Sequence, residues 1–465
     1  MKQPVKLYLS IIIIACIFCT SCSGKKDYDS LESQNIKLGE SQEPVKQQVD
    51  TWEKNLDNNS QSTTDMIADT EEADSSINIS DQKEDISNDF LHNFYDFTEE
   101  TLMHVTKDHE GENLIYAPLN LYLSLSTLNE LSEGEAKAEI QEALNISDDK
   151  DNALELNTAI SILEKRRLPP PLLIGRLNIN NSLWLSDEFN YQNDLLNTLQ
   201  SDYGTEIYKG NLKNRDFQEL MTKWVYENTN FAFQPDYTDS LDVGDPFSFI
   251  SLNTLDFYNE WIYPFEEEDT KTETFFLGDH KEISCDFMKK EYSDGSFMVG
   301  EDYISTMCYL QEFESMLFIL PKEGLSVDDF IEKRGNLSDI IDDWTNNQVS
   351  AGEVTLSVPK FSYEGKIDLI PIVERMGIKK IFEQNSNAFS IFTDENIYVS
   401  DILQASKIEI DEKGCTASSY TELGVRVSAG GTKDEIEINL NRPFIYILYK
   451  DKVPFLVGIV RNPLE

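Results

Sequence analysis

The sequence predicts an α+β fold for residues 87–465. Apolar residues at helical spacing dominate the first part of this region, whereas strand-like segments dominate the later part. Helices and strands that alternate along the chain are typical of a parallel α/β fold, but segregated runs favour an α+β domain. Because no internal repeat and no second linker interrupt the region, we expect one domain.

The predicted helices lie near the start of this region. Aromatic residues at helical spacing indicate the first helix: Phe90, Phe94 and Phe97. Pro118 begins a second helix, since proline at the first position lacks only a donor that the helix leaves unpaired. Leucines form one face of this second helix: Leu121, Leu125 and Leu128. Gly134 is expected just past its end.

Five later segments have the composition of strands. They are short and rich in β-branched and aromatic residues. The expected strands span 181–186, 247–258, 315–321, 354–363 and 442–450.

The chain is strongly acidic. Its 465 residues include 39 basic and 85 acidic ones, which gives a formal net charge of −46. Such a surface repels phosphate backbones, so no nucleic-acid partner is expected. The charge is typical of a well-solvated surface.

The first 22 residues indicate a signal peptide. Two lysines precede an apolar run, residues 7–19, that is too short to span a bilayer comfortably. Small residues then precede Cys22, a pattern that resembles the cleavage site of a bacterial lipoprotein, in which Cys22 would carry the lipid. Ordinary secretion is the alternative. Both interpretations of the leader place the protein outside the cytoplasm, either anchored at a bacterial cell surface or free. The lipid would be its only contact with a membrane.

Residues 23–86 are predicted to be a disordered polar and acidic linker. Tyr28 and Trp52 are the only aromatic residues between Lys26 and Asp85. So little apolar surface cannot offset the entropy lost on ordering. A flexible tether suits a lipid-anchored protein, and a partner-binding arm is the alternative.

The rest of the chain offers no metal or catalytic motif. Cys285, Cys308 and Cys415 are the cysteines outside the leader, and an odd set does not form a disulfide framework. The four histidines have neither zinc-ligand spacing nor a place in a catalytic motif. We therefore expect no cofactor, no metal and no hydrolase activity.

Residues 415–427 have the composition of a loop and the pattern of a strand. Every second residue is small or apolar: Cys415, Ala417, Ser419, Thr421, Leu423, Val425 and Val427. The residues between them are all able to face water. Alternation over thirteen residues suits a strand with one buried face. The pattern favours a loop that later joins a sheet, and an exposed strand edge is the alternative.

Several motifs resemble the serpin family over essentially all of residues 86–465. The segments that carry the resemblance are NLIYAPLNLYLSLSTL (113–128), NSLWL (181–185), SLNTLDFYNEWIYPF (251–265), IDEKG (410–414) and NRPFIYIL…PFLVGIVRNP (441–463). Each motif is weak alone, but their order and spacing make the match specific. The resemblance implies a serpin fold of three β-sheets and about nine helices, with an exposed reactive loop at about 412–432 that proteases cleave.

The resemblance assigns a hinge to the start of this loop. The hinge residues are Glu412, Lys413, Gly414, Cys415, Ala417 and Ser419. Small side chains there would let the loop enter a sheet without steric blockage. Lys360 is expected to form an ion pair with Glu412 near Trp261, at the top of the central sheet.

The reactive bond is expected between Ser428 and Ala429. The family's spacing from Glu412 reaches this bond, whereas a count back from residues 441–444 lands near Thr432. We favour the count from the hinge, because insertion depth is tied to the hinge. The bond Arg426–Val427 is the alternative.

The sequence departs from the family pattern beneath the central sheet. Ala117 and Asn120 replace two serines, and Gln404 replaces a histidine, whereas Asn253 matches the family's asparagine. Since buried polar groups must be paired, we expect Asn120, Asn253 and Gln404 to satisfy one another. The alternative is that Asn120 or Gln404 is simply solvated.

The implied function is inhibition of a serine protease by suicide trapping, without catalysis by the inhibitor itself. The protease forms its acyl-enzyme on the loop, and the cleaved loop then inserts into the central sheet. Val427 and Ser428 suit an elastase-like or subtilisin-like protease, and a cysteine protease is the other target class. The alternative function is that of a non-inhibitory serpin, a binding or structural protein. We expect a monomer.

Overall fold

The structure, a computed structural model, describes residues 85–465 except 148, 166–174, 238–248, 279–280, 334–335, 347, 400–401 and 416–433. The chain divides into two units, Met1–Ile79 and Ser80–Glu465, and the described residues all belong to the second. The expected signal peptide, Cys22 and nearly all of the expected linker therefore lie outside the described residues.

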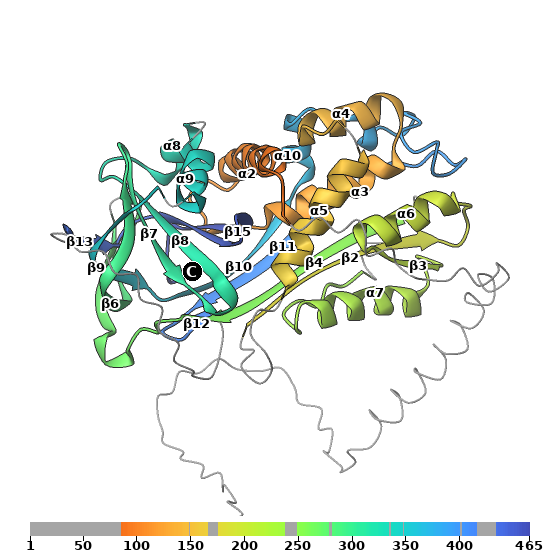
Figure 1. Cartoon of the computed structure of the whole chain (residues 1–465). Coiled ribbons are helices and arrows are strands. Elements are labelled where there is room, and N and C mark those ends of the chain that lie inside the picture. Colours follow the sequence, from red (N-terminus) through yellow and green to blue (C-terminus); the bar gives the residue numbers. More distant parts are fainter. Residues whose placement is uncertain are drawn as a thin grey trace, which may run out of the picture. The chain divides into compact units, whose positions relative to one another are not determined.

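Helices and strands are both numerous (Figure 1). The helices are α2 (Asn88–Asp108), α3 (Pro118–Leu131), α4 (Gly134–Leu144), α5 (Asp149–Glu164), α6 (Asn193–Tyr203), α7 (Arg215–Asn228), α8 (Val327–Glu332), α9 (Asn336–Thr345) and α10 (Ile370–Arg375), with short 3₁₀ turns η2 (Glu267–Asp269), η3 (Gln311–Phe313) and η4 (Lys380–Phe382). The strands are β1 (Leu114–Tyr116), β2 (Arg176–Ser186), β3 (Glu206–Gly210), β4 (Phe249–Glu260), β5 (Lys271–Phe276), β6 (Glu282–Val299), β7 (Tyr303–Tyr309), β8 (Glu314–Pro321), β9 (Ser350–Pro359), β10 (Phe361–Asp368), β11 (Leu403–Ile410), β12 (Gly414–Cys415), β13 (Asp434–Asn439), β14 (Phe444–Lys450) and β15 (Val453–Val460).

The strands form three sheets in the described part of the chain. One has nine strands in the order β1-β15-β14-β8-β7-β6-β9-β13, with β5 also paired to β6. The second has the order β12-β4-β2-β3, and the third contains β10 and β11. Three sheets and nine α-helices among these residues confirm the predicted α+β class.

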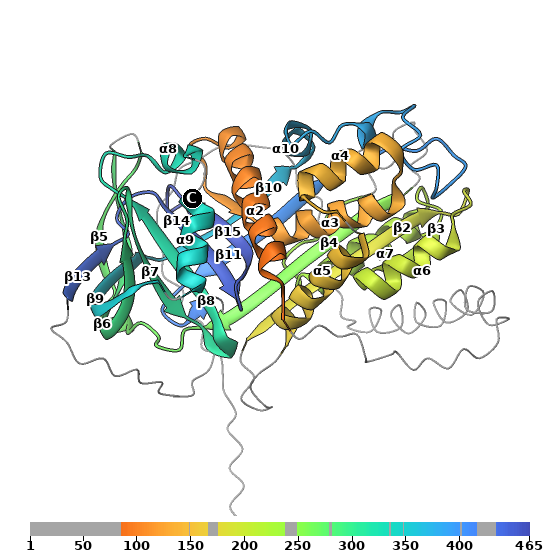
Figure 2. The same cartoon turned by 45° about the horizontal axis from the view of Figure 1, so that its top comes forward.

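The first helix forms as its aromatic spacing predicts. Ser87 caps α2, because its hydroxyl accepts a hydrogen bond from the Phe90 amide at 3.2 Å. The predicted aromatic face packs its rings around Tyr122 of α3, with centroid distances of 5.1 to 5.7 Å. Figure 2 shows α2 between α9 on one side and α3 and α4 on the other. No described helix is long and apolar enough to cross a membrane.

The predicted boundaries need two corrections. Gly134 does not end α3, which stops at Leu131; it is instead the first residue of α4, with φ of +60°. The segment 354–363 is two strands, because β9 ends at Pro359 and β10 begins at Phe361. Pro359 has no amide proton to donate, and the Lys360 amide then donates to Asp286 of β6 at 2.8 Å.

The C-terminal hairpin lies near one edge of the nine-stranded sheet, inside the edge strand β1. β14 and β15 pair with each other and lie between β1 and β8. Asp451 and Lys452 connect them with φ of 47° and 77°, the backbone that suits the twist of a tight hairpin. Every residue of both strands is buried.

Strand β4 is covered on both faces. Its Leu255 and Phe257 pack on the main hydrophobic core, whereas Ile250 and Leu252 pack on a second cluster that contains Trp224 of α7. Figure 1 shows α7 below β2 and β4, with α3 above them. Side chains at odd-numbered positions of β4 therefore face α3 and the core, as the period of a strand requires.

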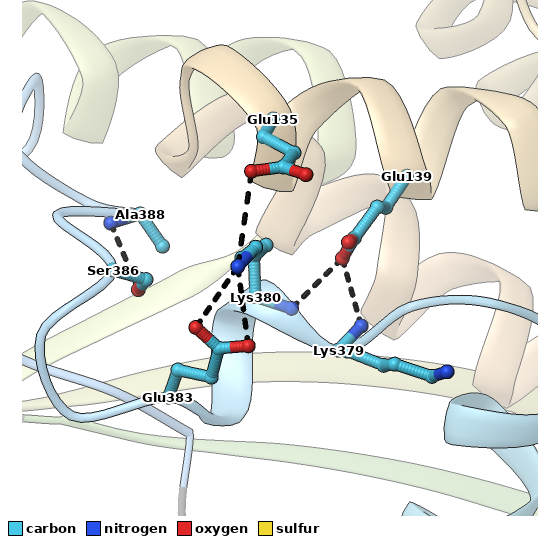
Figure 3. A network of polar contacts seen from close by, with 7 residues as sticks. All are labelled: Glu135, Glu139, Lys379, Lys380, Glu383, Ser386 and Ala388. Carbon is cyan, nitrogen blue, oxygen red and sulfur yellow. Dashed lines mark hydrogen bonds and ion pairs between the residues drawn. The ribbon is translucent and has the colours of Figure 1, made fainter.

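Carboxylates on α4 hold the segment that leads to β11 (Figure 3). Glu139 accepts hydrogen bonds from the backbone amides of Lys379 and Lys380, each at 2.8 Å. The Lys380 ammonium also pairs with Glu383 at 3.1 Å and lies 3.8 Å from Glu135. The two amides begin η4, so one carboxylate satisfies donors that a helix start leaves unpaired.

We expect Glu139→Ala to lower the free energy of unfolding by about 1 kcal/mol, because two amides lose a charged acceptor. Glu142→Ala is the matched control, since Glu142 lies on the same helix and is exposed. Denaturant unfolding of both variants measures the difference. Equal losses in the two variants would show that the Glu139 contacts do not stabilise the fold.

Candidate functional site

The candidate site begins where β11 ends, at the hinge segment Asp411 to Cys415. The Asp411 carboxylate accepts hydrogen bonds from the amides of Lys413 and Gly414, at 2.9 and 3.1 Å. The Asp411 amide also donates to the Gly414 carbonyl at 3.0 Å. An aspartate that bonds to amides two and three residues later stabilises a tight turn, so this turn reverses the chain after β11.

Gly414 is required by the close approach of the hinge segment to β4. Its φ is +155°, and a Cβ built on it would lie 2.4 Å from the carbonyl oxygen of Asn259. No larger residue fits without displacing the β4 backbone.

The hinge segment pairs with the end of β4 as a short strand. Gly414 stands opposite Glu260, and Cys415 stands opposite Asn259, in an antiparallel ladder. The Trp261 amide extends this ladder by donating to the Lys413 carbonyl at 2.9 Å. The predicted hinge residues 412–415 are therefore placed on β4, whereas Ala417 and Ser419 lie outside the described residues.

Trp261 and its neighbours hold the turn from the other side. The indole nitrogen of Trp261 donates to the Asp411 carbonyl at 3.0 Å. The Phe265 amide donates to the Glu412 carbonyl at 2.9 Å. Hydrogen bonds from Trp261 and Phe265 thus fix the backbone of the hinge segment.

The predicted ion pair between Lys360 and Glu412 is present. Their closest nitrogen–oxygen distance is 2.8 Å, and the Thr270 hydroxyl donates to the same carboxylate at 2.8 Å. Glu412 is buried, whereas the Lys360 side chain is 40% exposed. Lys360 stands at the break between β9 and β10, so the pair joins that break to the hinge segment.

The contacts of Glu412 change its pKa. Burial by itself would raise the pKa, but hydrogen bonds from Lys360, from the backbone and from Thr270 outweigh burial and lower the pKa below its ordinary value. The hydrogen bond to Glu412 raises the pKa of Lys360. Both shifts favour the charged forms of the pair.

No described strand joins β4 to β11. β11 pairs with β10, and β4 pairs with β2 and, through two of its twelve residues, with β12. β12 contacts both β4 and β11, so it occupies the start of a strand position between them. Within the described residues, the edge of β4 from 249 to 258 has no strand partner on this side.

The polar residues beneath β4 are arranged differently from the prediction. Asn253 donates to the Ser124 hydroxyl at 2.6 Å, and Ser124 in turn donates to the backbone carbonyl of Asn120. The carboxamide of Gln404 accepts from the amide of Ala117 at 2.7 Å and donates to its carbonyl at 3.0 Å. The expectation that Asn120, Asn253 and Gln404 satisfy one another is therefore wrong.

The correction has a physical reason in helix α3. Ser124 follows Asn120 by one helical turn and shares its face, so it lies between Asn120 and Asn253. Ala117 is the N-cap of α3 and has no side chain that could cap it, and Gln404 bonds to its backbone. The carboxamide oxygens of Asn120 and Asn253 are buried and have no hydrogen-bond partner within the described residues.

Two cysteines lie in the strands of the largest sheet. Cys285 of β6 and Cys308 of β7 are buried and free. Burial raises the pKa of these thiols to about 11 and about 12.

Among the described residues, no group of three or more His, Cys, Asp or Glu side chains could hold a metal ion. The reactive-bond candidates Ser428, Ala429, Arg426 and Val427 lie outside the described residues.

Comparison with known proteins identifies the family. The model of the family Serpin (serine protease inhibitor) matches residues 92–463, and the chain belongs to this family. The chain is similar to the "Serine protease inhibitor" of Cyanea capillata, with 23% identity over 76% of this chain and 93% of that protein. It is also similar to Serpin B5 of Homo sapiens, with 27% identity over 73% of this chain and 90% of that protein.

Solved structures agree with the fold. The thermophilic serpin Tengpin in its native state superposes with a TM-score of 0.70 and 25% identity, over 82% of this chain and 96% of that one. Human thyroxine-binding globulin, complexed with thyroxine, superposes with a TM-score of 0.68 and 20% identity, over 81% of this chain and 99% of that one. A thermophilic serpin and a thyroxine-binding globulin thus share this architecture.

Several residues of the site were not found from the sequence. Thr270 lies in a segment that carries no motif, and Phe265 ends the motif 251–265, which gives no sign of the contact with Glu412. Asp411 did have a signal, since an aspartate followed by Glu-Lys-Gly is typical of a turn. Ser124 had a weaker one, its position one helical turn after Asn120.

The ion pair predicts a pH dependence of stability. A lowered carboxyl pKa adds stability above the unfolded value, about 4.3, and this stability is lost as pH falls through the folded value. A raised lysine pKa adds stability below about 10.4, lost as pH rises through the folded value. We expect the difference in Tm between the parent and Glu412→Gln to be largest between about pH 5 and pH 10.

The same comparison with Glu409→Gln is the control. Glu409 lies on β11 and is exposed. A Tm difference for Glu412→Gln that stays constant down to about pH 3, below the pKa of the unfolded carboxyl, would contradict the assignment of the charge to this pair.

Proposed function

We propose that this serpin inhibits a serine protease by suicide trapping, in which the cleaved reactive loop inserts between β4 and β11. The observation that carries the proposal is the placement of β12. Its two residues already pair with β4 and contact β11, at the point where the alternation of residues 415–427 begins. A strand that starts in this position has a place to continue.

The register of β12 makes the proposal specific. Cys415 stands opposite Asn259, so an antiparallel continuation would place Ala417 opposite Phe257 and Ser419 opposite Leu255. Directly opposed residues share a face of the sheet. Leu255 and Phe257 face the core. The small and apolar set of the loop would therefore face the core as well, as its alternation requires.

The length of β4 supports the expected reactive bond. In the same register Val425 would stand opposite Phe249, the first residue of β4. The eleven residues from 415 to 425 would span about 36 Å. A bond at Ser428–Ala429 leaves three residues beyond this point, so cleavage there would free enough chain to fill the whole edge.

Unpaired groups beneath β4 also favour insertion. The register would place Thr421 opposite Asn253, whose carboxamide oxygen is buried and without a partner among the described residues. A threonine hydroxyl at this position could donate to that oxygen. Leaving such a group unpaired costs about 1 to 3 kcal/mol, which insertion would recover.

The energy of insertion is sufficient for the mechanism. Each backbone hydrogen bond contributes about 1 kcal/mol net, and a strand with partners on both sides also buries apolar side chains. The total is on the order of ten kcal/mol or more. This free energy would drive the movement of the attached protease and the distortion of its active site, which strands the acyl-enzyme.

The target class follows from the residues before the expected bond. Val427 and Ser428 suit the small pockets of an elastase-like or subtilisin-like protease. Cleavage after Arg426 would instead indicate a trypsin-like enzyme, and a cysteine protease that forms a thioester on the loop is the other class of target. No cofactor is required by any of these.

A non-inhibitory role is the competing function. The solved complex of thyroxine-binding globulin with thyroxine is the observation that favours it, because a member of similar fold binds a small ligand. A binding protein would not need its cleaved loop to insert. The place of action is a further proposal: the leader pattern ending at Cys22 supports a lipid-anchored or secreted protein outside the cytoplasm.

The trapping step is tested with Cys415→Arg. The parent should form complexes with a serine protease that survive SDS. The variant should be cleaved without forming them, because an arginine in the first inward-facing position would bury an unpaired charge. Thr416→Arg is the matched control, since this residue is expected to face water. Complex formation by Cys415→Arg at the parent level would contradict the inward assignment.

Cleavage of the loop should raise thermal stability. The freed strand would pair its backbone with the open edge, whereas most proteins lose stability when nicked. The intact and cut proteins are compared by thermal unfolding after the cut is located by mass spectrometry. An unchanged or lower Tm after a cut at Ser428–Ala429 would favour the non-inhibitory function. A sole cut after Arg426 with a raised Tm would keep the mechanism and change the target class.

A further inference from the structure

A fully buried ion pair lies next to Asn259, near the end of β4. Lys450, the last residue of β14, and Glu314, the first residue of β8, have side chains with 0% exposure. Their nitrogen–oxygen distance is 3.3 Å. Two charges removed from water are costly unless further hydrogen bonds satisfy them, so the other partners of the pair decide what it does.

Lys450 binds the C-terminal end of α5. Its ammonium donates to the Leu163 carbonyl at 2.8 Å and to the Lys165 carbonyl at 3.1 Å. The last carbonyls of a helix lack intrahelical donors and carry partial negative charge. The lysine therefore caps α5, and its contact with Glu314 fixes the position of the carboxylate beside it.

Glu314 binds the side chain of Asn259. The carboxamide nitrogen of Asn259 donates to Glu314 at 2.5 Å and to the Gln311 carbonyl at 2.6 Å. Its carboxamide oxygen accepts from the Glu260 amide at 2.8 Å. Asn259 has 0% exposure, so all of its hydrogen bonds are made inside the protein.

Asn259 is also the residue on which the hinge segment rests. Its backbone pairs with Cys415, and its carbonyl oxygen is the atom that a Cβ at Gly414 would meet first. The two amides that bind the hinge carbonyls, Trp261 and Phe265, follow within six residues. The position of Asn259 thus sets the edge on which the first step of insertion takes place.

We propose that Glu314 is a positioning residue for the hinge, acting through Asn259 and held in place by Lys450. The buried pair anchors the end of β4 to β8, β14 and α5, so that this edge remains fixed while β12 pairs with it. Only the expected effect of Glu314 on protease trapping rests on the proposed function. The anchoring itself is a property of the intact protein and is measured there.

The first test removes the link and leaves the ion pair. Asn259→Ala deletes the carboxamide, and Asn152→Ala is the matched control. Asn152 is also buried, at 4% exposure, and its carboxamide makes two hydrogen bonds: it accepts from the Tyr122 hydroxyl and donates to Ser126. Hydrogen exchange of the Trp261 and Phe265 amides, followed in the intact full-length protein by mass spectrometry, reports hinge docking directly.

We expect exchange at these two amides to rise about tenfold in Asn259→Ala relative to Asn152→Ala, as expected when hydrogen bonds to a charged group are lost. The two variants should lose similar global stability. Equal exchange at Trp261 and Phe265 in the two variants would overturn the proposal, because Asn259 would then be an ordinary buried amide.

A second variant covers the case in which Asn259→Ala does not fold. Glu314→Met combined with Lys450→Met removes both charges and leaves apolar side chains of comparable length, which proteins tolerate better than half of a buried pair. Exchange at the same two amides should again rise about tenfold over the control. Parental exchange in this double variant would overturn the role of Glu314.

The exchange result at Trp261 and Phe265 is independent of the proposed function. Absence of SDS-stable complexes from the parent protein would refute suicide trapping and leave the exchange result intact. If the parent does trap a protease, Asn259→Ala should shift the outcome of the encounter from complex towards cleaved inhibitor, whereas Asn152→Ala should not. An unchanged ratio of complex to cleaved protein would then contradict the consequence for trapping.

Discussion

The fold depends on two strands, β4 and β11, that do not pair with each other and that leave room for one further strand between them. Within the described residues, β4 and β11 are joined only through the two residues of β12. Backbone groups at a strand edge are satisfied only by another strand, by side chains or by water. The faces of β4 are closed by the core and by α7, so only its edge is open to change. Under the proposed function, this open edge would store free energy, and the stability of the intact protein would be partly kinetic.

Two sets of contacts oppose each other at the top of this sheet. The turn at Asp411, the Lys360–Glu412 pair and the Trp261 contacts hold the hinge segment at the first rung. The buried carboxamide oxygen of Asn253, which has no hydrogen-bond partner among the described residues, would favour a longer strand in the proposed mechanism. Because the Lys360 side chain is 40% exposed, its ion pair with Glu412 is worth about 1 kcal/mol or less, far below the energy of a complete strand. In the proposed mechanism the hinge contacts would therefore control when the strand extends, whereas the sheet would control how far.

The sequence predicted most of the fold and part of the site. The phenylalanines of α2, the leucines of α3 and the strands β2, β4, β8 and β14 follow from local periodicity, which acts over a few residues. The Lys360–Glu412 pair was predicted through the family pattern, not from spacing. Thr270, Ser124 and the Glu314–Lys450 pair were missed, because residues 129 to 142 positions from their partners meet only through the tertiary fold. The partners of Gln404 were wrong for the same reason, since an uncapped helix at Ala117 competes for its carboxamide.

The place of the C-terminal hairpin has a consequence for biosynthesis. β14 and β15 are made last, yet they lie between β1 and β8 inside the largest sheet. A nascent chain that lacks residues 444–460 can pair β8, β7, β6 and β9 with one another, but β1 then has no strand partner among the described residues and one edge of β8 stays open. Completion of this sheet must therefore wait until the very end of synthesis.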